Sequence, residues 1–228
     1  MTDSKRNRVR SMFDGIARRY DLLNRSLSAG VDVFWRKKTI RLADVPKGGA
    51  VLDVACGTGD LSAEAKKAGA GVTLGVDLSI EMLRLFAEKR PWSRGASALA
   101  VAEEFPFADE SFDRIVVSFG VRNFYDLPAA FREFRRTLKP GGAAAILEFS
   151  LPKNPVVRFF YRFYIKRILP FVGGVVSGER SAYRYLPESV EAFDRDVDLV
   201  ALLKEAGFAS VKRKTLTFGV VQVVVAQR

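Results

Sequence analysis

Apolar residues recur at helical spacing along the first 45 positions of the chain. Five of them, separated mostly by arginine and other polar residues, mark one face of a helix: Val9, Met12, Phe13, Ile16 and Ala17. Ser28-Ala29-Gly30 interrupts this pattern, and Asp32 is placed to cap a second helix. Turn residues at 46–49 then end a helical leader that covers positions 1–45.

Between Ala50 and Ser150 the pattern alternates between short apolar runs and amphipathic stretches. The apolar runs predict strands at 51–55, 72–76, 97–102, 115–119 and 143–149. The amphipathic stretches predict helices at 61–68, 80–89 and 127–138, the second of them capped by Ser79. Lys139-Pro140-Gly141-Gly142 predicts a turn before the fifth strand. This alternation is typical of a parallel sheet with helices on both faces.

The pattern changes at Pro152. Residues 156–168 are crowded with aromatic and basic side chains, and a Gly-rich turn region follows at 170–178. Regular structure returns after Pro187, where a short helix is predicted at 188–193. A helix at 197–206, which ends at Gly207, and strands at 211–216 and 220–226 complete the chain. The last two strands are close enough in sequence to form a terminal hairpin.

Composition narrows the classes of protein that fit. The chain has 228 residues and 48% hydrophobic content, which suits one domain of ordinary size. No apolar run reaches the roughly 18 to 20 residues of a spanning helix, and the polar, basic first ten residues do not resemble a secretory signal. A single cysteine and no histidine argue against a disulfide framework, a zinc site and a histidine-based triad, so we expect no metal and a reducing compartment.

The net charge bears on possible partners. Lys and Arg number 37 against 26 Asp and Glu, a formal charge of +11. Such an excess suits a polyanion or an anionic membrane surface, although a merely basic protein has the same composition.

The strand at 51–55 runs into a Gly-rich turn, Asp53-x-Ala55-x-Gly57-x-Gly59, and an acidic residue, Asp77, ends the next strand. Glycines let the backbone approach a ligand closely, and a carboxylate at a strand end can accept hydrogen bonds from both ribose hydroxyls. The pattern therefore predicts a nucleoside site. It lacks the third glycine of the GxGxxG dinucleotide motif, which argues against a nicotinamide oxidoreductase.

Two other residues of the turn have competing interpretations. Asp60 either faces the cofactor or stabilises the start of the following helix. Cys56 is either a reactive thiol or a small residue that fills a tight turn.

Further motifs make a family resemblance specific. They are Tyr20-Asp21-Leu22-Leu23-Asn24 with Trp35, Phe119-Gly120-Val121-Arg122-Asn123, Tyr183-Arg184-Tyr185-Leu186-Pro187-Glu188-Ser189-Val190 and Phe218-Gly219-Val220-Val221. From about Asp14 to Gln227 the chain resembles the ubiquinone/menaquinone biosynthesis C-methyltransferases (UbiE/MenG type). The resemblance implies a Rossmann-like α/β fold of the class I methyltransferases, with a mostly parallel seven-stranded sheet and an antiparallel C-terminal strand. It also implies S-adenosylmethionine as cofactor.

The resemblance also suggests a division of the chain. We expect a single methyltransferase domain over 1–228, in which 1–45 is a helical leader or lid and 50–150 is the cofactor-binding core. Residues 151–187 are expected to form an acceptor-side insertion, and residues 188–228 the C-terminal helix and strands.

The family's cofactor contacts map onto one group of positions. These are Asp53, Gly57, Thr58 and Gly59 in the turn, Asp77 at the ribose, Val101 and Ala102 by the adenine, and Ser118 at the end of the fourth strand. They agree with the rule that ligands lie outside the carboxyl ends of parallel strands.

On the acceptor side, we hypothesise that Arg122 and Asn123 bind the hydroquinol oxygens and that Arg122 stabilises the developing phenolate. Arg122 could instead form a strand-end salt bridge. Tyr20 either hydrogen-bonds the substrate, closes a lid or simply packs. The general base stays open between a carboxylate, a tyrosine, a water and an arginine-held water.

Three positions depart from the family pattern. Asp32 stands where the leader motif usually carries histidine, and Val224 where the tail motif carries histidine. Val101 replaces a usual Asp or Asn, so a side-chain hydrogen bond to the adenine is lost. Asp32 and Val224 put in doubt any acceptor contact that the family makes through those histidines.

The resemblance implies methylation of a polyprenyl quinol, demethylmenaquinol or also the ubiquinol precursor, by a cytoplasmic protein. Aromatic and basic residues at 156–187 suit a peripheral membrane contact at the inner face of the cytoplasmic membrane, or alternatively core packing or a homodimer interface. Competing functions are a methyltransferase acting on another small molecule or on RNA, and a non-enzymatic quinone or lipid carrier. No appended RNA-binding module is visible, so no nucleic acid is expected.

Overall fold

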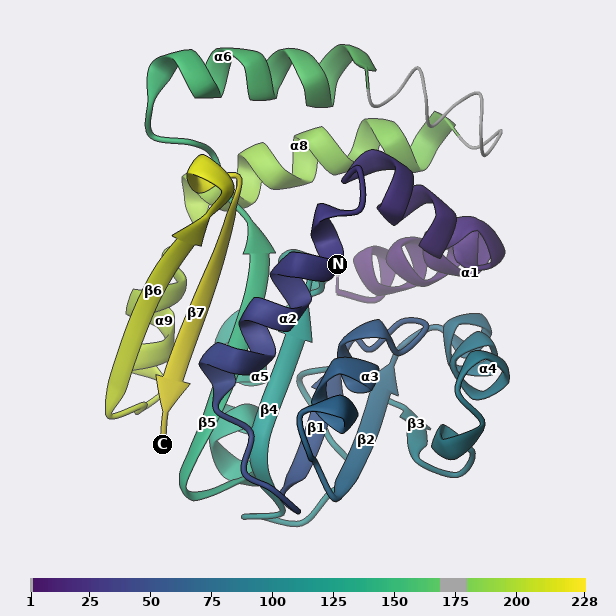
Figure 1. Ribbon diagram of the computed structural model, residues 1–228, viewed down its shortest axis with the longest axis vertical. Coiled ribbons are helices and arrows are strands. Elements are labelled where there is room, and N and C mark those ends of the chain that lie inside the picture. The colour runs from purple at the N-terminus through teal and green to yellow at the C-terminus, as the bar shows by residue number, and fades with distance from the viewer. Residues whose placement is uncertain (1, 169–179) are drawn as a thin grey trace.

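A computed structural model describes residues 2–168 and 180–228 of the chain (Figure 1). The strands are β1 (Ala50–Val54), β2 (Val72–Asp77), β3 (Ser97–Leu99), β4 (Phe112–Ser118), β5 (Leu138–Phe149), β6 (Ser210–Leu216) and β7 (Val221–Gln227). The longer helices are α1 (Thr2–Leu27), α2 (Val31–Ala43), α3 (Asp60–Lys67), α4 (Ile80–Lys89), α5 (Leu127–Thr137), α6 (Pro155–Phe163), α8 (Arg180–Asp196) and α9 (Leu199–Glu205). Short helical turns are η1 (Pro91–Ser93), η2 (Val121–Asn123), η3 (Tyr164–Ile168, a π-helical turn) and η4 (Thr217–Gly219).

The strands form one seven-stranded sheet in the order β3-β2-β1-β4-β5-β7-β6. Strands β1 to β5 pair in parallel, whereas β7 lies antiparallel to both β5 and β6. The predicted terminal hairpin is therefore confirmed, and so is the mostly parallel sheet with an antiparallel C-terminal strand. Because β7 inserts between β5 and β6, all its backbone groups face paired neighbours.

Helices cover both faces of the sheet (Figure 1). On one face, α2 and α3 pack Ile40 and Leu61 against Val51 and Val116 of β1 and β4. On the other face, a larger cluster joins α5 and α9 to the sheet through the fully buried side chains Phe131, Phe134, Leu199 and Leu203. Burial on both faces explains why the central strands read as continuous apolar runs.

One predicted boundary is wrong. The short helix expected to begin after Pro187 is part of α8, which starts at Arg180 and carries the proline inside it. Proline removes a backbone donor and disfavours a helix interior. Here Pro187 is buried and the same helix buries Val190 and Phe193 (2% and 7% exposed), so tertiary packing outweighs the local preference. The Gly-rich region predicted at 170–178 lies outside the described residues.

Two strand ends also differ from prediction. β5 already begins at Leu138, which pairs with Phe112 of β4. The predicted turn at 139–142 therefore lies inside the strand, where it forms an irregularity, and regular pairing resumes between Ala143 and Arg114. Gly141 takes φ +75° there, a conformation open to glycine. The third strand ends at Leu99 rather than at Ala102, because the chain bends away to reach the next segment.

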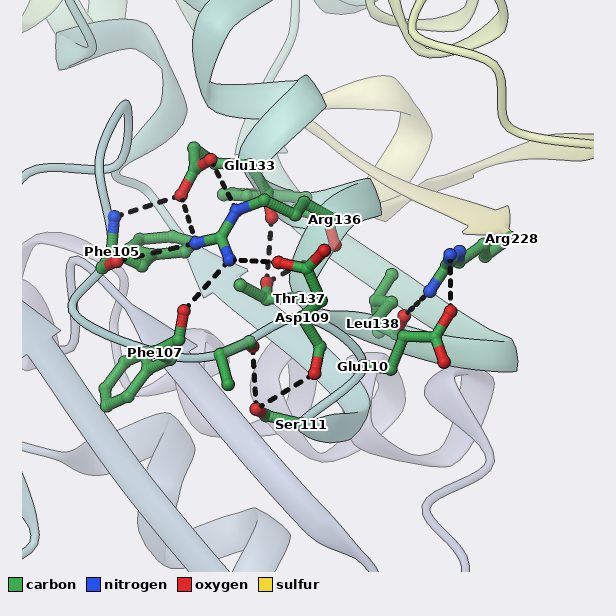
Figure 2. A network of polar contacts seen from close by, with 12 residues as sticks. Phe105, Phe107, Asp109, Glu110, Ser111, Glu133, Arg136, Thr137, Leu138 and Arg228 are labelled. Carbon is green, nitrogen blue, oxygen red and sulfur yellow. Dashed lines mark hydrogen bonds and ion pairs between the residues drawn. The ribbon is translucent and has the colours of Figure 1, made fainter.

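An arginine on α5 fixes the loop that follows the third strand (Figure 2). The Arg136 guanidinium donates to the carboxylates of Glu133 and Asp109 and to the carbonyl of Phe107 (2.6–2.9 Å). These hydrogen bonds hold the pKa of Glu133 below its usual value. Arg228 similarly donates to Glu110, so the C-terminus is tied to the same loop. The loop is thus held on the α5 side of the sheet, next to the segment that carries Val101 and Ala102.

Candidate active site

The Gly-rich turn joins β1 to α3 in left-handed backbone conformations. Ala55, Gly57 and Gly59 take φ values of +52°, +55° and +79°. A Cβ atom on Gly59 would lie 2.0 Å from the ring of Phe86, so a side chain cannot fit there. Gly59 is therefore required by the close packing of the turn against Phe86 of α4, and the close approach of the turn to a ligand stays a prediction.

Asp77 ends β2 and organises this turn. One carboxylate oxygen accepts the Gly57 N–H at 2.8 Å, and the other accepts the Ser79 N–H at 2.9 Å. Burial raises the pKa of Asp77 to about 6, and the backbone hydrogen bonds oppose that rise. The carboxylate is therefore mostly ionised at neutral pH and can accept further hydrogen bonds from its exposed edge.

A narrow cavity of about 30 Å³ lies at the carboxyl ends of the parallel strands. Asp77, Val101 and Ala102 line it, together with Asn123 from η2. The structure thus brings three of the predicted cofactor residues around one space. Arg6 and Val9 of α1 also line it, so the N-terminal helix borders this cavity.

Other predicted cofactor residues bind the protein itself. Asp53 is fully buried and accepts a hydrogen bond from Ser62 at the start of α3, and burial raises its pKa to about 7. Thr58 donates to Asp21 of α1 at 2.6 Å. Ser118 is half-buried at the end of β4. Asp53 and Thr58 therefore hold the turn to α3 and α1, and contact of Asp53, Thr58 and Ser118 with a cofactor stays a prediction.

The two ambiguous residues of the turn are also placed. Asp60 is the first residue of α3 and pairs with Lys89 at 2.7 Å, which fits the helix-start interpretation. Burial raises the pKa of the Cys56 thiol well above its usual value, which favours the protonated, less reactive form.

A second, larger cavity of about 370 Å³ lies between α1, α2, η3 and α8. Its wall is mostly apolar and aromatic, and it includes Tyr20, Asp32, Arg122 and Tyr185. Tyr20 stands beside the Gly-rich turn, since a Cβ atom on Gly57 would lie 3.7 Å from its ring. Tyr20 thus lies where the cofactor turn meets the larger cavity.

Arg122 and Asn123 are adjacent in sequence but line different cavities. Arg122 lines the larger one, and its guanidinium donates to Glu148 at 2.8 Å and to the Phe119 carbonyl at 2.6 Å. Asn123 lines the narrower one and accepts the Tyr185 hydroxyl at 2.9 Å. Arg122 therefore forms the strand-end salt bridge and also faces the acceptor cavity. The hypothesis that both residues bind the hydroquinol oxygens stays a prediction, and it requires the acceptor to reach both cavities.

Tyr20 is a neutral hydrogen-bonding group. Burial raises its pKa, so the phenol keeps its proton at neutral pH. Its ring also packs edge-on against Phe13, with the centroids 6.0 Å apart. The packing and hydrogen-bonding interpretations of Tyr20 are therefore compatible.

Helix α1 separates the two cavities and is held by polar contacts. Its Asp14 accepts a hydrogen bond from Ser79, and its Asp21 pairs with Lys89 and accepts from Thr58. These contacts join the leader to the cofactor turn and to α4. That residues 1–45 act as a lid stays a prediction, and a lid would have to break and re-form these contacts.

Sequence reasoning missed Glu148. It is fully buried in β5 and accepts hydrogen bonds from the Arg122 side chain and from the backbone of Phe149 and Arg122. The available signal was a glutamate inside the apolar run Ala143–Phe149, because a buried carboxylate needs a partner. Val224, one of the departures from the family pattern, is fully buried in β7 within the sheet core.

Ala55 and Gly120 should behave as a coupled pair. A Cβ atom on Gly120 would lie 2.6 Å from the Cβ of Ala55, and Ala55 already has a positive φ. We expect Gly120→Ala to lower the free energy of unfolding by about 1–3 kcal/mol through overpacking. Ala55→Gly should relieve that contact, so the double variant should recover much of the loss in denaturant unfolding. Purely additive effects would contradict the coupling.

Comparisons with known proteins agree with this geometry. A profile of the ubiE/COQ5 methyltransferase family matches residues 1–228. The demethylmenaquinone methyltransferase of Chlorobaculum parvum is 44% identical over 218 residues, which cover 93% of this chain and 89% of that protein. The ubiquinone/menaquinone biosynthesis C-methyltransferase UbiE of Syntrophotalea carbinolica is 44% identical over 93% of this chain and 91% of its own length. A solved S-adenosylmethionine-dependent methyltransferase from Thermotoga maritima has a TM-score of 0.65 at 18% identity, covering 95% of this chain and 98% of that one.

Proposed function

The chain belongs to the ubiE/COQ5 methyltransferase family, and on that premise we propose that it methylates a ring carbon of a polyprenylated hydroquinol, with S-adenosylmethionine as donor. Relatives that are 40–44% identical over most of the chain are named demethylmenaquinone methyltransferase or UbiE. The proposed reaction therefore converts demethylmenaquinol to menaquinol, or the corresponding ubiquinol precursor. The observation that carries the proposal is the junction of a nucleoside site with a large apolar cavity at Tyr20.

The residues present fit the cofactor. Asp77 offers an ionised carboxylate edge for the ribose hydroxyls, and the backbone at Val101 and Ala102 borders the space for the adenine. In the Gly57–Gly59 turn, Gly57 borders the ring of Tyr20 at the larger cavity and Gly59 packs against Phe86. When bound, S-adenosylmethionine supplies a methyl group that its sulfonium has already activated.

The acceptor cavity provides orientation and charge stabilisation. Holding the ring carbon in line with the methyl and the sulfur removes most of the entropic barrier. Arg122 presents a cation to the phenolate that develops on the quinol, and it acts in a largely apolar cavity where that charge counts for more than in water. Tyr20 keeps its proton and can donate a hydrogen bond at the junction of the two sites.

The polyprenyl tail needs an apolar exit. Tyr161, Tyr164 and Ile165, from α6 and η3, line one side of the cavity. Helix α6 lies across the end of the molecule above α8, as Figure 1 shows. We propose that the tail leaves the cavity beneath α6.

The outer side of α6 fits a peripheral contact with an anionic membrane at the inner face of the cytoplasmic membrane. Its large apolar side chains are more than half exposed: Val156 (62%), Phe159 (67%), Phe160 (64%) and Phe163 (54%). Arg158 and Arg162 lie between them along the chain, and Lys166 follows in η3. Exposed aromatic residues with interleaved cations are typical of helices that lie in a lipid interface. Within 2–168 and 180–228, the structure contains no helix long and apolar enough to cross a bilayer.

Removing two of these phenylalanines should abolish vesicle binding. We expect Phe159→Ser/Phe160→Ser to lower partitioning into phosphatidylcholine vesicles that contain phosphatidylglycerol about tenfold or more, because two large apolar groups lose their burial. Leu99→Ser, at a 57% exposed site on the edge strand β3, is the matched control. Flotation assays measure the effect. Equal flotation of both variants and wild type, or no binding by wild type, would remove the membrane contact and leave a dimer interface as the use of this face.

A methyl-transfer assay tests the proposed function. Labelled S-adenosylmethionine is supplied with demethylmenaquinol, the benzoquinol precursor or total RNA, and label is expected in a quinol. Label in RNA, together with salt-sensitive RNA binding, would support an RNA methyltransferase instead. If calorimetry detects no cofactor binding, the protein is a carrier rather than an enzyme.

A further inference from the structure

The larger cavity contains an acidic side chain that the proposed mechanism has not yet used. Asp32, in the first turn of α2, is the one carboxylate among the described residues that line this cavity. It is only 2% exposed, a degree of burial that an aspartate tolerates when it is paired with a cation.

Its two oxygens are held differently. Oδ2 accepts a charge-assisted hydrogen bond from Nη1 of Arg36, one turn along α2, and Oδ1 accepts the Ser28 hydroxyl at 2.7 Å. Arg36 is itself buried at 5% exposure and lies over the Phe119 ring, 5.6 Å from its centroid. Each carboxylate oxygen can accept two hydrogen bonds, so Oδ1 keeps capacity for a further donor.

The other ionisable groups around the cavity are poorly suited to take a proton. The chain has no histidine. Burial raises the pKa values of Tyr20, Tyr161 and Tyr185, so these phenols stay protonated and act as donors. Asp32 and Glu148 each pair with an arginine, but Asp32 lines the cavity, whereas Glu148 is fully buried in β5 outside its lining and accepts from Arg122 and from two backbone N–H groups. Asp32 remains as the acceptor.

We propose that Asp32 accepts the hydroxyl proton of the acceptor ring during methyl transfer; this inference rests on the proposed function. The ring carbon bonds to the methyl carbon as the S–CH₃ bond breaks, with the electron pair kept on sulfur. The hydroxyl proton moves to Asp32 and the hydroxyl carbon becomes a carbonyl. The ring C–H proton then leaves to water, the ring becomes aromatic again, and the phenolate takes back the proton from Asp32. One proton is released in all.

A purely structural Asp32–Arg36 ion pair predicts a different response to mutation. Removing one partner of a buried pair strands the other charge, whereas replacing both partners by neutral groups is often tolerated. Asp32→Asn/Arg36→Gln should then recover the activity that Asp32→Asn loses. If Asp32 takes the proton, the double variant stays at least tenfold slower than wild type. Asp44→Asn, at an exposed left-handed position at the end of the same helix, is the matched control.

Single-turnover methyl transfer with saturating cofactor measures these effects, and cofactor binding with thermal unfolding verifies that each variant is folded. A second acceptor, a ring-halogenated hydroquinol already ionised at the assay pH and methylated by wild type, needs no base. The loss in the double variant should shrink to within about threefold on this substrate. Recovery of the double variant on the natural quinol, or an equal loss on both substrates, would overturn the role of Asp32. An inactive wild type on every quinol would instead refute the proposed function.

Discussion

Replacing Arg122 should lower turnover on the order of a hundredfold or more while leaving cofactor affinity close to wild type. Arg122 lines the larger cavity, proposed here for the acceptor, whereas the predicted cofactor residues Asp77 and Ala102 line the narrow one. Its cation would act where negative charge develops on the acceptor oxygen. A transition-state interaction of this kind appears in kcat and kcat/KM alike rather than in cofactor binding.

The variant must be designed around Glu148. Arg122→Ala would leave this fully buried carboxylate without its cation, which costs about 3–5 kcal/mol and could unfold the protein. Arg122→Gln/Glu148→Gln removes both charges and keeps polar side chains in place. The expected loss of turnover should persist in this double variant.

The matched control is Arg132→Ala, an exposed arginine on α5. Steady-state kinetics and cofactor calorimetry on the same preparations separate chemistry from binding. A folded double variant with near-wild-type turnover would leave Arg122 with a structural role only.

The sequence predicted the elements that are determined by residues close together in the chain, such as apolar strands, helix caps and Gly-rich turns. The largely apolar segment Val51–Val54, in which Asp53 is the one polar residue, became a central strand buried on both faces, and Ser79 caps α4 by accepting the Met82 N–H, as predicted. The sequence placed the Gly-rich turn and Asp77 at one nucleoside site but did not predict that they touch, and the structure shows the Gly57 N–H donating to Asp77 at 2.8 Å. In each case the residues involved lie on one element or at the ends of neighbouring strands.

Features that depend on packing between distant segments were not predictable. Pro187 reads as a helix start, but it lies inside α8 because the neighbouring residues pack into the core. Arg122 and Asn123 read as one motif, yet η2 turns them into different cavities. The partner of Arg122, Glu148, lies 26 residues away on β5, a distance that no local pattern reports.

Cofactor affinity should fall as the pH drops through about 6. Burial raises the pKa of Asp77 to about 6 in the cofactor-free protein, and hydrogen bonds from ribose hydroxyls favour its ionised form. Below pH 6 binding must therefore expel a proton, and affinity should fall up to about tenfold per pH unit. Above about pH 7 the affinity should be flat. Calorimetry in two buffers of different ionisation enthalpy measures the proton released.

Acid unfolding through Asp77 or Asp53 does not explain a fall in cofactor affinity at low pH. The folded pKa of Asp77 lies above the ordinary value of an aspartate, so its contribution to stability is present at low pH and disappears as the pH rises through about 6. Asp53 shifts in the same direction, to about 7. Neither group destabilises the protein on acidification, so weaker binding near pH 5 reports the ribose site.

Asp77→Asn identifies the group responsible. Asp77 accepts hydrogen bonds from two backbone N–H groups, and in the asparagine variant the side-chain NH₂ would face one of these donors with a donor of its own. The amide is also uncharged, so it binds the ribose hydroxyls less strongly than the carboxylate does. Cofactor affinity should therefore fall about tenfold to a hundredfold and lose its dependence on pH. Asp53→Asn is the control, because the pKa of the Asp53 carboxyl lies in the same range as that of Asp77. The side-chain carbonyl of the asparagine can still accept the hydrogen bond from Ser62. If Asp53→Asn rather than Asp77→Asn removes the pH dependence, the titrating group lies behind the turn, and Asp77 is not the ribose acceptor.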